Sequence, residues 1–263
     1  MVFSSSFALA VALVCVNVPI SHAWDNGLAR TPPMGWCSWN GFHRNFNESL
    51  FYAVANALST NGMSDAGYKY VNVDGGWWAG SDTGHIVRNM TGFPTWNTQK
   101  YPNGIPKLVE YIHSKGLKYG HYTDAGKHAC NGDAPMSEGF EFEDASLFAQ
   151  WGADMLKVDA CGDVENHTAI VARWRAAIEA TGRPILFSNC HNGCQTDAGP
   201  GHPDSWLPDN QCERDANMWR SSADISATWS SMLHNLDSLK GRGMYAYPGA
   251  WYVQCAPCYV SSL

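Results

Sequence analysis

The chain has 263 residues, of which 45% are hydrophobic and 16% charged, and its formal net charge is −7. This length suffices for one large domain, and the hydrophobic content is too high for a disordered chain. An acidic balance without a basic run argues against nucleic acids and anionic membranes as partners. The 12 Trp residues exceed what a core needs, and acidic surfaces rich in aromatic residues are common in sugar-binding clefts.

The first 23 residues have the pattern of a cleaved secretory signal. Residues 7–18 form an apolar run too short to span a bilayer, and a small-x-small exit follows at 21–23. Cleavage would also remove Cys15 and leave eight cysteines, an even number suited to disulfides in an oxidising compartment. No later apolar stretch reaches about 18 residues, so we expect no membrane anchor.

Glycosylation signals agree with a secretory route. Three Asn-x-Ser/Thr acceptors are present, at Asn47, Asn89 and Asn166. Such triplets also arise by chance, so they support the route without establishing it. We expect a secreted or lysosome/vacuole-directed protein.

Strands and amphipathic helices alternate from residue 34 onward. Apolar residues spaced at i, i+3, i+4 and i+7 predict the helices, and three of these end at a glycine. In chain order the predicted elements are a strand at 34–39, a helix at 50–58, a strand at 70–74, a helix at 105–112, strands at 118–122 and 155–159, a helix at 170–178, strands at 184–188 and near 218–220, a helix at 225–236 and a strand near 244–247.

About seven strand–helix units with helical crossovers predict an α/β protein with a parallel sheet. No Gly-x-Gly-x-x-Gly follows the first strand, which disfavours a dinucleotide-binding sheet. The pattern therefore favours a (β/α)8 barrel of the TIM type, in one domain over 24–251 without a linker or second domain.

Polar residues recur where the predicted strands end. In such a barrel, side chains at the C-terminal strand ends build the active site. The alternative is that Asp and Asn at strand ends form turns and cap helices, but five such positions on one rim are hard to explain in that way. They are Trp39, Asp74, Tyr122 with Asp124, Lys157 with Asp159, and Arg220 with Asp224.

Two of these carboxylates suit the hydrolysis of a glycosidic bond. Lys157, Asp159 and Cys161 alternate and so point to the same side of a strand, where the lysine ammonium would keep Asp159 ionised as a nucleophile. Asp224 would protonate the leaving oxygen, although it could also be the N-cap of the following helix. The two groups stand about 5–5.5 Å apart in retaining enzymes. Strands 4 and 6 face one another across a barrel mouth, which permits this.

Six motifs, in the same order from about Asn26 to Trp251, resemble the melibiases of glycoside hydrolase family 27. These are α-galactosidase and α-N-acetylgalactosaminidase enzymes. The motifs are Thr31-Pro-Pro-Met-Gly-Trp-Cys-Ser-Trp39, Asn72-Val-Asp74, Tyr122-Thr-Asp-Ala-Gly126, Lys157-Val-Asp-Ala-Cys161, Trp219-Arg-Ser-Ser-Ala-Asp224 and Tyr247-Pro-Gly-Ala-Trp251.

The resemblance implies a retaining enzyme for terminal α-galactosides, without a metal or organic cofactor. It assigns Asp159 as the nucleophile and Asp224 as the acid/base. It also implies a disulfide between Cys130 and Cys161, a second between Cys190 and Cys212, and homodimer formation, of which the sequence has no independent sign. The implied sugar contacts are Trp39, Asp74, Tyr122, Lys157 and Arg220.

Around the sugar the chain departs from the family pattern. The family has a second aspartate after strand 2, which holds galactose hydroxyls, where this chain has Gly75. The next family cysteine is Gly76 here, and its usual partner aligns near Arg44. After strand 5 a Cys-Glu-Trp run is expected, whereas His191 stands at the glutamate. His191 is still expected to contact the sugar, since a histidine can hydrogen-bond a hydroxyl.

A larger departure lies at the C-terminus. Residues 252–263 match neither the eighth strand nor the C-terminal β-sandwich of the family, so we expect an incomplete barrel of about seven strands. A truncated, alternatively spliced or mispredicted gene product would explain this. A metal or redox role for Cys255 and Cys258 is disfavoured in a secreted chain with one such pair. Cys37 and Cys194 have no assignable partner.

The sequence therefore predicts a retaining hydrolase of terminal α-galactose on oligosaccharides, glycolipids or glycoproteins. One alternative keeps the chemistry but changes the sugar to α-N-acetylgalactosamine, β-L-arabinopyranose or another α-glycoside, because of Gly75 and His191. The other is a non-catalytic product that binds sugar or is inert. Retention of both carboxylates argues against a binding module, whereas the incomplete barrel argues for an inactive product.

Overall fold

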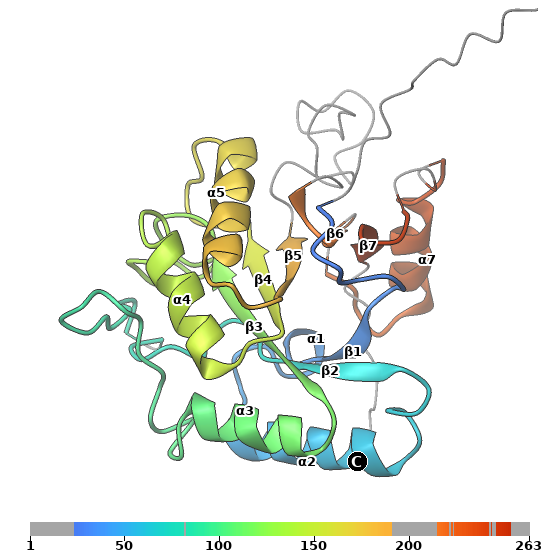
Figure 1. Ribbon diagram of the computed structural model, residues 1–263, viewed down its shortest axis with the longest axis horizontal. Helices are drawn as coiled ribbons and strands as arrows, with labels where there is room; N and C mark the ends of the chain where they lie inside the picture. Colours follow the sequence, from blue (N-terminus) through green and yellow to red (C-terminus); the bar gives the residue numbers. More distant parts are fainter. Residues whose placement is uncertain are drawn as a thin grey trace, which may run out of the picture.

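Seven strands form one parallel sheet with the strands in sequence order, β1 to β7. The computed structural model describes residues 24–81, 83–190, 215–220, 222, 224–241, 243 and 246–253. The sheet curls, and helices surround its outer side (Figure 1). This confirms the predicted α/β architecture with about seven strands, and among the described strands β1 and β7 stand at the two ends of the sheet.

The elements follow one another in the predicted alternation. They are β1 (Met34–Cys37), α1 (Trp39–Phe42), α2 (Glu48–Thr60), β2 (Tyr68–Asn72), α3 (Ile105–Ser114), β3 (Lys118–Asp124), α4 (Glu141–Trp151), β4 (Met155–Asp159), α5 (His167–Ala180), β5 (Leu186–Cys190), β6 (Met218–Arg220), α7 (Trp229–Asp237) and β7 (Trp251–Val253).

The last strand lies elsewhere than predicted. Residues 244 and 245 of the strand predicted near 244–247 lie outside the described residues, and its described part is not a strand, because Tyr247 pairs with Ala250 across a tight turn and β7 begins only at Trp251. Pro248 and Gly249 make this turn, and Gly249 has a φ of 103°, which favours glycine. The motif from Tyr247 to Trp251 is therefore the turn that leads into β7.

Helix boundaries follow from capping. The Thr228 side chain accepts a hydrogen bond from the Ser231 amide and starts α7, which consequently begins later than the apolar pattern predicted. Asp224 is thus not the N-cap of this helix. Helix α4 was missed in the sequence because its inward face includes charged residues, Glu141 and Asp144.

Strand register brings the polar residues to one level. Tyr122 on β3 is paired with Lys157 on β4, and Lys157 with Ser188 on β5. Two residues further on, Asp124 is paired with Asp159. Because parallel strands end at the same edge of a sheet, these side chains share the C-terminal rim.

An aromatic cluster supports this rim from behind. The rings of Trp77, His121, Phe148 and Trp151 lie 4.3 to 5.8 Å apart between centroids. Burial lowers the pKa of His121 to about 3, so the imidazole is neutral at physiological pH. The Trp77 indole N–H donates to the Tyr122 carbonyl oxygen at 2.8 Å and so fixes the end of β3.

Several predicted features lie outside the described residues: the signal segment 1–23, His191, Cys194, Cys212, Cys255 and Cys258. The predicted glycosylation sites are described, and all three asparagine side chains are exposed. In the described part of the chain, no helix has the length and apolar character needed to cross a membrane.

Asn217, which directly precedes β6, links three segments through its fully buried side chain. Its Oδ1 accepts hydrogen bonds from the Phe187 amide at 3.0 Å and from the Asn26 Nδ2 at 3.1 Å. Its Nδ2 donates to the Asn26 Oδ1 at 3.0 Å and to the Gly249 carbonyl at 3.2 Å. One amide thus joins the N-terminal segment, β5 and the turn before β7.

We expect Asn217→Ala to lower the free energy of unfolding by about 3 kcal/mol, because it leaves several buried polar groups without partners. Urea unfolding followed by tryptophan fluorescence measures this loss. Asn45→Ala, at an exposed asparagine, is the control and should change stability by less than about 0.5 kcal/mol. Equal stability of the two variants would contradict the role of Asn217.

Candidate active site

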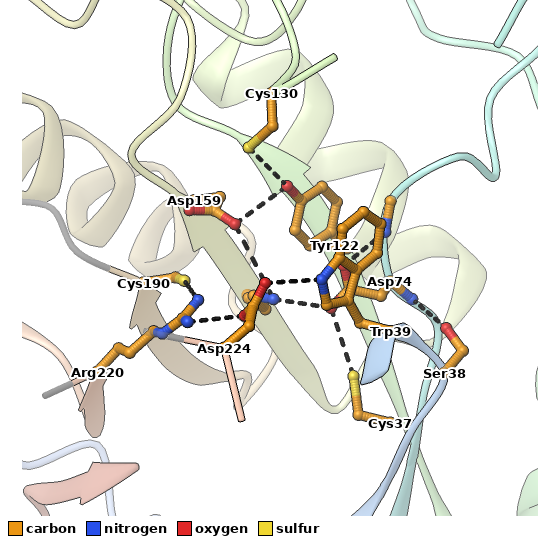
Figure 2. Close-up of polar contacts among 12 residues, drawn as sticks. Cys37, Ser38, Trp39, Asp74, Tyr122, Cys130, Asp159, Cys190, Arg220 and Asp224 are labelled. Atoms are coloured by element: carbon orange, nitrogen blue, oxygen red, sulfur yellow. Dashed lines mark hydrogen bonds and ion pairs between the residues drawn. The ribbon is translucent and has the colours of Figure 1, made fainter. Parts of the chain in front are cut away.

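The rim residues predicted from the sequence come together at the C-terminal ends of β1 to β6 (Figure 2). The carboxyl groups of Asp159 and Asp224 turn toward the same space, which the Trp39 and Tyr122 rings border. Asp159 is the last residue of β4, and Asp224 lies in the loop after β6. Residues from both halves of the sheet therefore contribute to one site.

Lys157 supplies a positive charge inside this acidic site. Its side chain is only 13% exposed, and its Nζ lies 2.7 Å from Asp74 Oδ2 and 4.0 Å from Asp159 Oδ2. The ammonium also lies 4.9 Å from the centre of the Tyr122 ring, within cation–π range. The buried ammonium thus offsets part of the negative charge that these two carboxyls bring into the site.

Asp74 is held from several sides. Its Oδ2 also accepts a hydrogen bond from the Cys37 thiol at 3.4 Å, and its Oδ1 accepts one from the Gly75 amide at 2.8 Å. The Asp74 amide donates to the Ser38 hydroxyl at 3.1 Å. Cys37, to which the sequence assigned no partner, thus contacts a residue of the site.

The hydroxyl of Tyr122 contacts two carboxyls. It lies 2.7 Å from Asp124 Oδ1 and 3.1 Å from Asp159 Oδ2. Asp159 Oδ1 accepts a hydrogen bond from the Ala160 amide at 2.9 Å. Both oxygens of Asp159 are therefore oriented by donors, and the carboxyl is 11% exposed.

Asp224 is bound by two donors. The Trp39 indole N–H donates to its Oδ2 at 2.8 Å, and the Arg220 guanidinium lies 2.7 Å from its Oδ1. Burial raises the pKa of Asp224, but the charge of Arg220, the indole hydrogen bond and the charge of Lys157 outweigh it, so the pKa lies below its usual range. Arg220 itself is 6% exposed and is fixed through a hydrogen bond to the Ser222 carbonyl.

A disulfide joins Cys130 and Cys161, as the resemblance implied. It links the loop after β3 to the end of β4 beside the acidic groups. The oxygens of Asp124 and Asp159 and the two sulfurs lie within 4.8 Å of one another. Because the sulfurs are bonded to each other, this cluster offers no thiolate ligands to a metal ion.

A cavity of about 280 Å³ adjoins these groups. Its lining includes Trp39, Asp74, Lys157 and Arg220, and three methionines also contribute. The volume is close to the lower end of the roughly 300–1,000 Å³ typical of small-molecule pockets. Asp159 and Asp224 are not among its lining residues, so the cavity reaches the predicted sugar contacts but not the two carboxyls that face each other. The methionines are Met34, Met155 and Met218.

Aromatic rings occupy the surroundings of Gly75. A Cβ added to Gly75 would lie 3.3 Å from the Tyr122 ring and 3.6 Å from the Trp78 ring. These two rings are stacked, with centroids 6.5 Å apart. A second carboxylate at this position would therefore require the neighbouring rings to shift.

Arg44 lies against Gly76, as the sequence alignment indicated. A Cβ on Gly76 would lie 3.0 Å from the Arg44 Nε. The guanidinium pairs at 2.6 Å with the buried carboxylate of Asp133, which also accepts from the Trp78 indole N–H at 2.8 Å. This ion pair joins the loop after β1 to the loop after β3, whereas the family disulfide would join the loop after β1 to the loop after β2.

The structure brings together Trp39, Asp74, Tyr122, Lys157, Asp159, Arg220 and Asp224. The predicted sugar contact His191 and Cys212, the predicted disulfide partner of Cys190, lie outside the described residues. Cys190 lies within 3.4 Å of the Arg220 guanidinium. The sequence gave no specific role to Asp124, although its two-residue spacing from Tyr122 on one strand placed it on the same side.

Comparison with known proteins identifies the family. A family model described as Alpha galactosidase A matches residues 31–252. The chain belongs to the melibiase family, glycoside hydrolase family 27. It is 38% identical over 235 residues to an alpha-galactosidase of Oryza sativa, covering 88% of this chain and 51% of the relative. It is also 38% identical over 253 residues to alpha-galactosidase A of Cellvibrio japonicus, covering 92% and 58%.

A solved alpha-galactosidase from Saccharomyces cerevisiae has the same fold, with a TM-score of 0.71 and 29% identity. The match covers 86% of this melibiase-family chain and 52% of the yeast chain. The chain therefore spans about half the length of the relatives it matches.

We expect Arg220→Gln to raise the pKa of Asp224, because the guanidinium is the strongest group that lowers it. A carboxyl with a lowered folded-state pKa stabilises the fold above its ordinary pKa of about 3.9, and this contribution is lost as the pH falls through the folded value. In Arg220→Gln the contribution of ionised Asp224 to the free energy of unfolding becomes smaller. A ¹³C NMR titration of labelled aspartates measures the shift.

Arg173→Gln is the control for this titration. Arg173 on α5 is half exposed and pairs with the buried carboxyl of Glu141 on α4, and neither residue contacts Asp224 in the described part of the chain. The control should leave the Asp224 midpoint in place. An unchanged Asp224 midpoint in Arg220→Gln would show that Arg220 does not set it.

Proposed function

We propose that this chain is a retaining glycoside hydrolase that removes terminal α-galactose by double displacement. The observation that carries the proposal is the pair of carboxyls, Asp159 and Asp224, which face one space beside the Lys157 ammonium. Membership of the melibiase family and 38% identity to alpha-galactosidases support the assignment of substrate. The substrate class is oligosaccharides, glycolipids or glycoproteins that end in α-galactose.

In the first step Asp159 attacks the anomeric carbon while the glycosidic C–O bond breaks. Asp224 gives its proton to the departing oxygen, and a covalent glycosyl–enzyme ester forms. Lys157 and Tyr122 hold Asp159 in the orientation and charge that the attack needs. Trp39, Asp74 and Arg220 contact the sugar around this centre.

In the second step Asp224 takes a proton from water, and the resulting hydroxide attacks the anomeric carbon. The ester bond to Asp159 breaks, and the released sugar keeps its original configuration. For the first step Asp224 has to be protonated, which the Arg220 contact opposes in the empty site. A sugar hydroxyl that binds Arg220 would draw the guanidinium from Asp224 and raise the pKa of that carboxyl.

A second candidate keeps this mechanism and changes the sugar to α-N-acetylgalactosamine, β-L-arabinopyranose or another α-glycoside. Gly75 is the specific observation in its favour, because one recognition carboxylate of the family pattern is missing and the Tyr122 and Trp78 rings border its place. A panel of chromogenic glycosides distinguishes the candidates. Higher kcat/KM on one of these glycosides than on the α-galactoside would replace the assignment of galactose.

We also propose that the protein travels the secretory route to the outside of the cell or to the lysosome or vacuole. The signal-like segment 1–23 and the exposed acceptors Asn47, Asn89 and Asn166 support this route. The disulfide between Cys130 and Cys161 suits an oxidising compartment. Homodimer formation remains part of the proposal on the basis of the family resemblance.

We expect Asp159→Asn to abolish turnover of α-galactosides, because an amide cannot form the glycosyl ester. Asp224→Asn should lower kcat/KM for an alkyl α-galactoside by about 10²–10⁴-fold. With a nitrophenyl α-galactoside the loss in the first step should be smaller, since nitrophenolate leaves without protonation. Release of galactose and of nitrophenol, measured separately, checks both expectations.

Glu165→Gln is the matched control, because Glu165 is an exposed carboxyl whose ion pair in the described part of the chain is with the exposed Lys127. It should retain full activity. Full activity of Asp159→Asn would remove the nucleophile assignment. If a version extended through an eighth strand hydrolyses the substrate and the chain as given does not, the chain as given is an inactive product.

A further inference from the structure

Tyr122 has one hydroxyl proton and more than one acceptor within reach. Its oxygen lies 2.7 Å from Asp124 Oδ1, 3.1 Å from Asp159 Oδ2 and 3.7 Å from the Cys130 sulfur. If both carboxyls were ionised, this single proton could satisfy only one of them. The shorter of the two contacts, to Asp124, would then take the proton away from Asp159.

The disulfide removes another source of protons. Cys130 Sγ lies 3.2 Å from Asp124 Oδ1, a distance at which a thiol could donate. The sulfur is bonded to Cys161 and carries no hydrogen. Asp124 Oδ1 contacts the Tyr122 hydroxyl and the Cys130 sulfur. Because the sulfur has no hydrogen, a hydrogen bond at either contact needs a proton from Asp124 or from Tyr122.

Burial adds to this shortage of donors. Asp124 is fully buried, and its Oδ2 has no hydrogen-bond partner among the described residues. An ionised carboxylate with one oxygen unpaired in the interior is costly, and a neutral acid at the same place costs less. The facing charged and titratable groups are Asp159, Asp74, Lys157 and Tyr122.

We propose that Asp124 is a neutral carboxylic acid that donates its proton to the Tyr122 hydroxyl, which in turn donates to Asp159. This relay uses two protons for two hydrogen bonds, at 2.7 and 3.1 Å, and leaves Asp159 as the anionic member. Asp124 is thus a positioning residue that acts through Tyr122. The functional part of this inference rests on the hydrolase mechanism proposed above.

The electrostatics agree with the geometry. Burial is the largest cause that raises the pKa of Asp124 well above its usual range, and the charge of Asp159 raises it further. The Tyr122 hydrogen bond and the Lys157 charge act in the opposite direction and are outweighed. A neutral Asp124 places one negative charge instead of two around the Tyr122 hydroxyl, so the proton of this hydroxyl is available to the nucleophile.

Infrared spectroscopy tests the protonation state of Asp124 in the ligand-free protein, through the difference between the spectra of the unmodified chain and of each variant. The measurement does not require enzymatic activity. We expect a C=O stretching band of a protonated carboxylic acid at neutral pH, which Asp124→Asn removes. The control Glu165→Gln, at an exposed carboxyl, should keep the band. Absence of the band from the unmodified chain, or its persistence in Asp124→Asn, would overturn the proposal.

Tyr122→Phe gives a second test that does not alter Asp124 itself. It removes the acceptor of the proposed hydrogen bond, so the band should persist and move to higher frequency. A band at an unchanged frequency would contradict the relay. This variant also keeps the test decisive if Asp124→Asn does not fold.

Kinetics separate positioning from mere packing. The amide of Asp124→Asn can still donate to Tyr122, whereas the side chain of Asp124→Leu cannot. We expect kcat of the leucine variant to fall about tenfold, because the variant lacks one hydrogen bond of ordinary strength. The asparagine variant should lose less, because it keeps a donor. Equal losses in both variants would contradict the donor role. If no variant hydrolyses any glycoside, the proposed function fails, while the infrared result still decides the state of Asp124.

Discussion

The site depends on one buried ammonium group, that of Lys157. It lies 2.7 Å from Asp74 and 4.0 Å from Asp159, and its charge helps to lower the pKa of Asp224. Without this cation, several carboxyls gathered at one rim would repel one another and favour protonation. Lys157 therefore brings positive charge to Asp74 and Asp159 in a largely buried place.

The fold delivers these groups through the register of parallel strands. Tyr122 and Lys157 are paired neighbours on β3 and β4, and the pair Asp124 and Asp159 follows two residues later. The disulfide at the end of β4 and the aromatic cluster behind Tyr122 restrict movement at this point. Asp224 comes from a loop on the other half of the sheet, and Trp39 joins it across 185 residues of sequence. Such preorganisation is what a transition state with developing charge requires.

Much of this arrangement could be predicted from the sequence, because strand alternation and helical periodicity are local. The alternation at Lys157 and Asp159 placed both on one side of β4, and the strand Met155–Asp159 has the predicted bounds. The last strand was misplaced because a Pro-Gly turn interrupts an apolar segment that resembles a strand. The bond from Trp39 to Asp224 and the protonation of Asp124 depend on contacts between distant segments and on burial, which no local pattern encodes.

The most direct test of the central claim is to trap the covalent intermediate. Incubation with a 2-deoxy-2-fluoro-α-galactosyl fluoride, followed by digestion and mass spectrometry, reports which side chain becomes glycosylated. The account predicts a single fluoroglycosyl group attached to Asp159, and loss of labelling when Asp159 is replaced by Asn. Attachment to any other residue, or release of the sugar with inverted anomeric configuration, would contradict it.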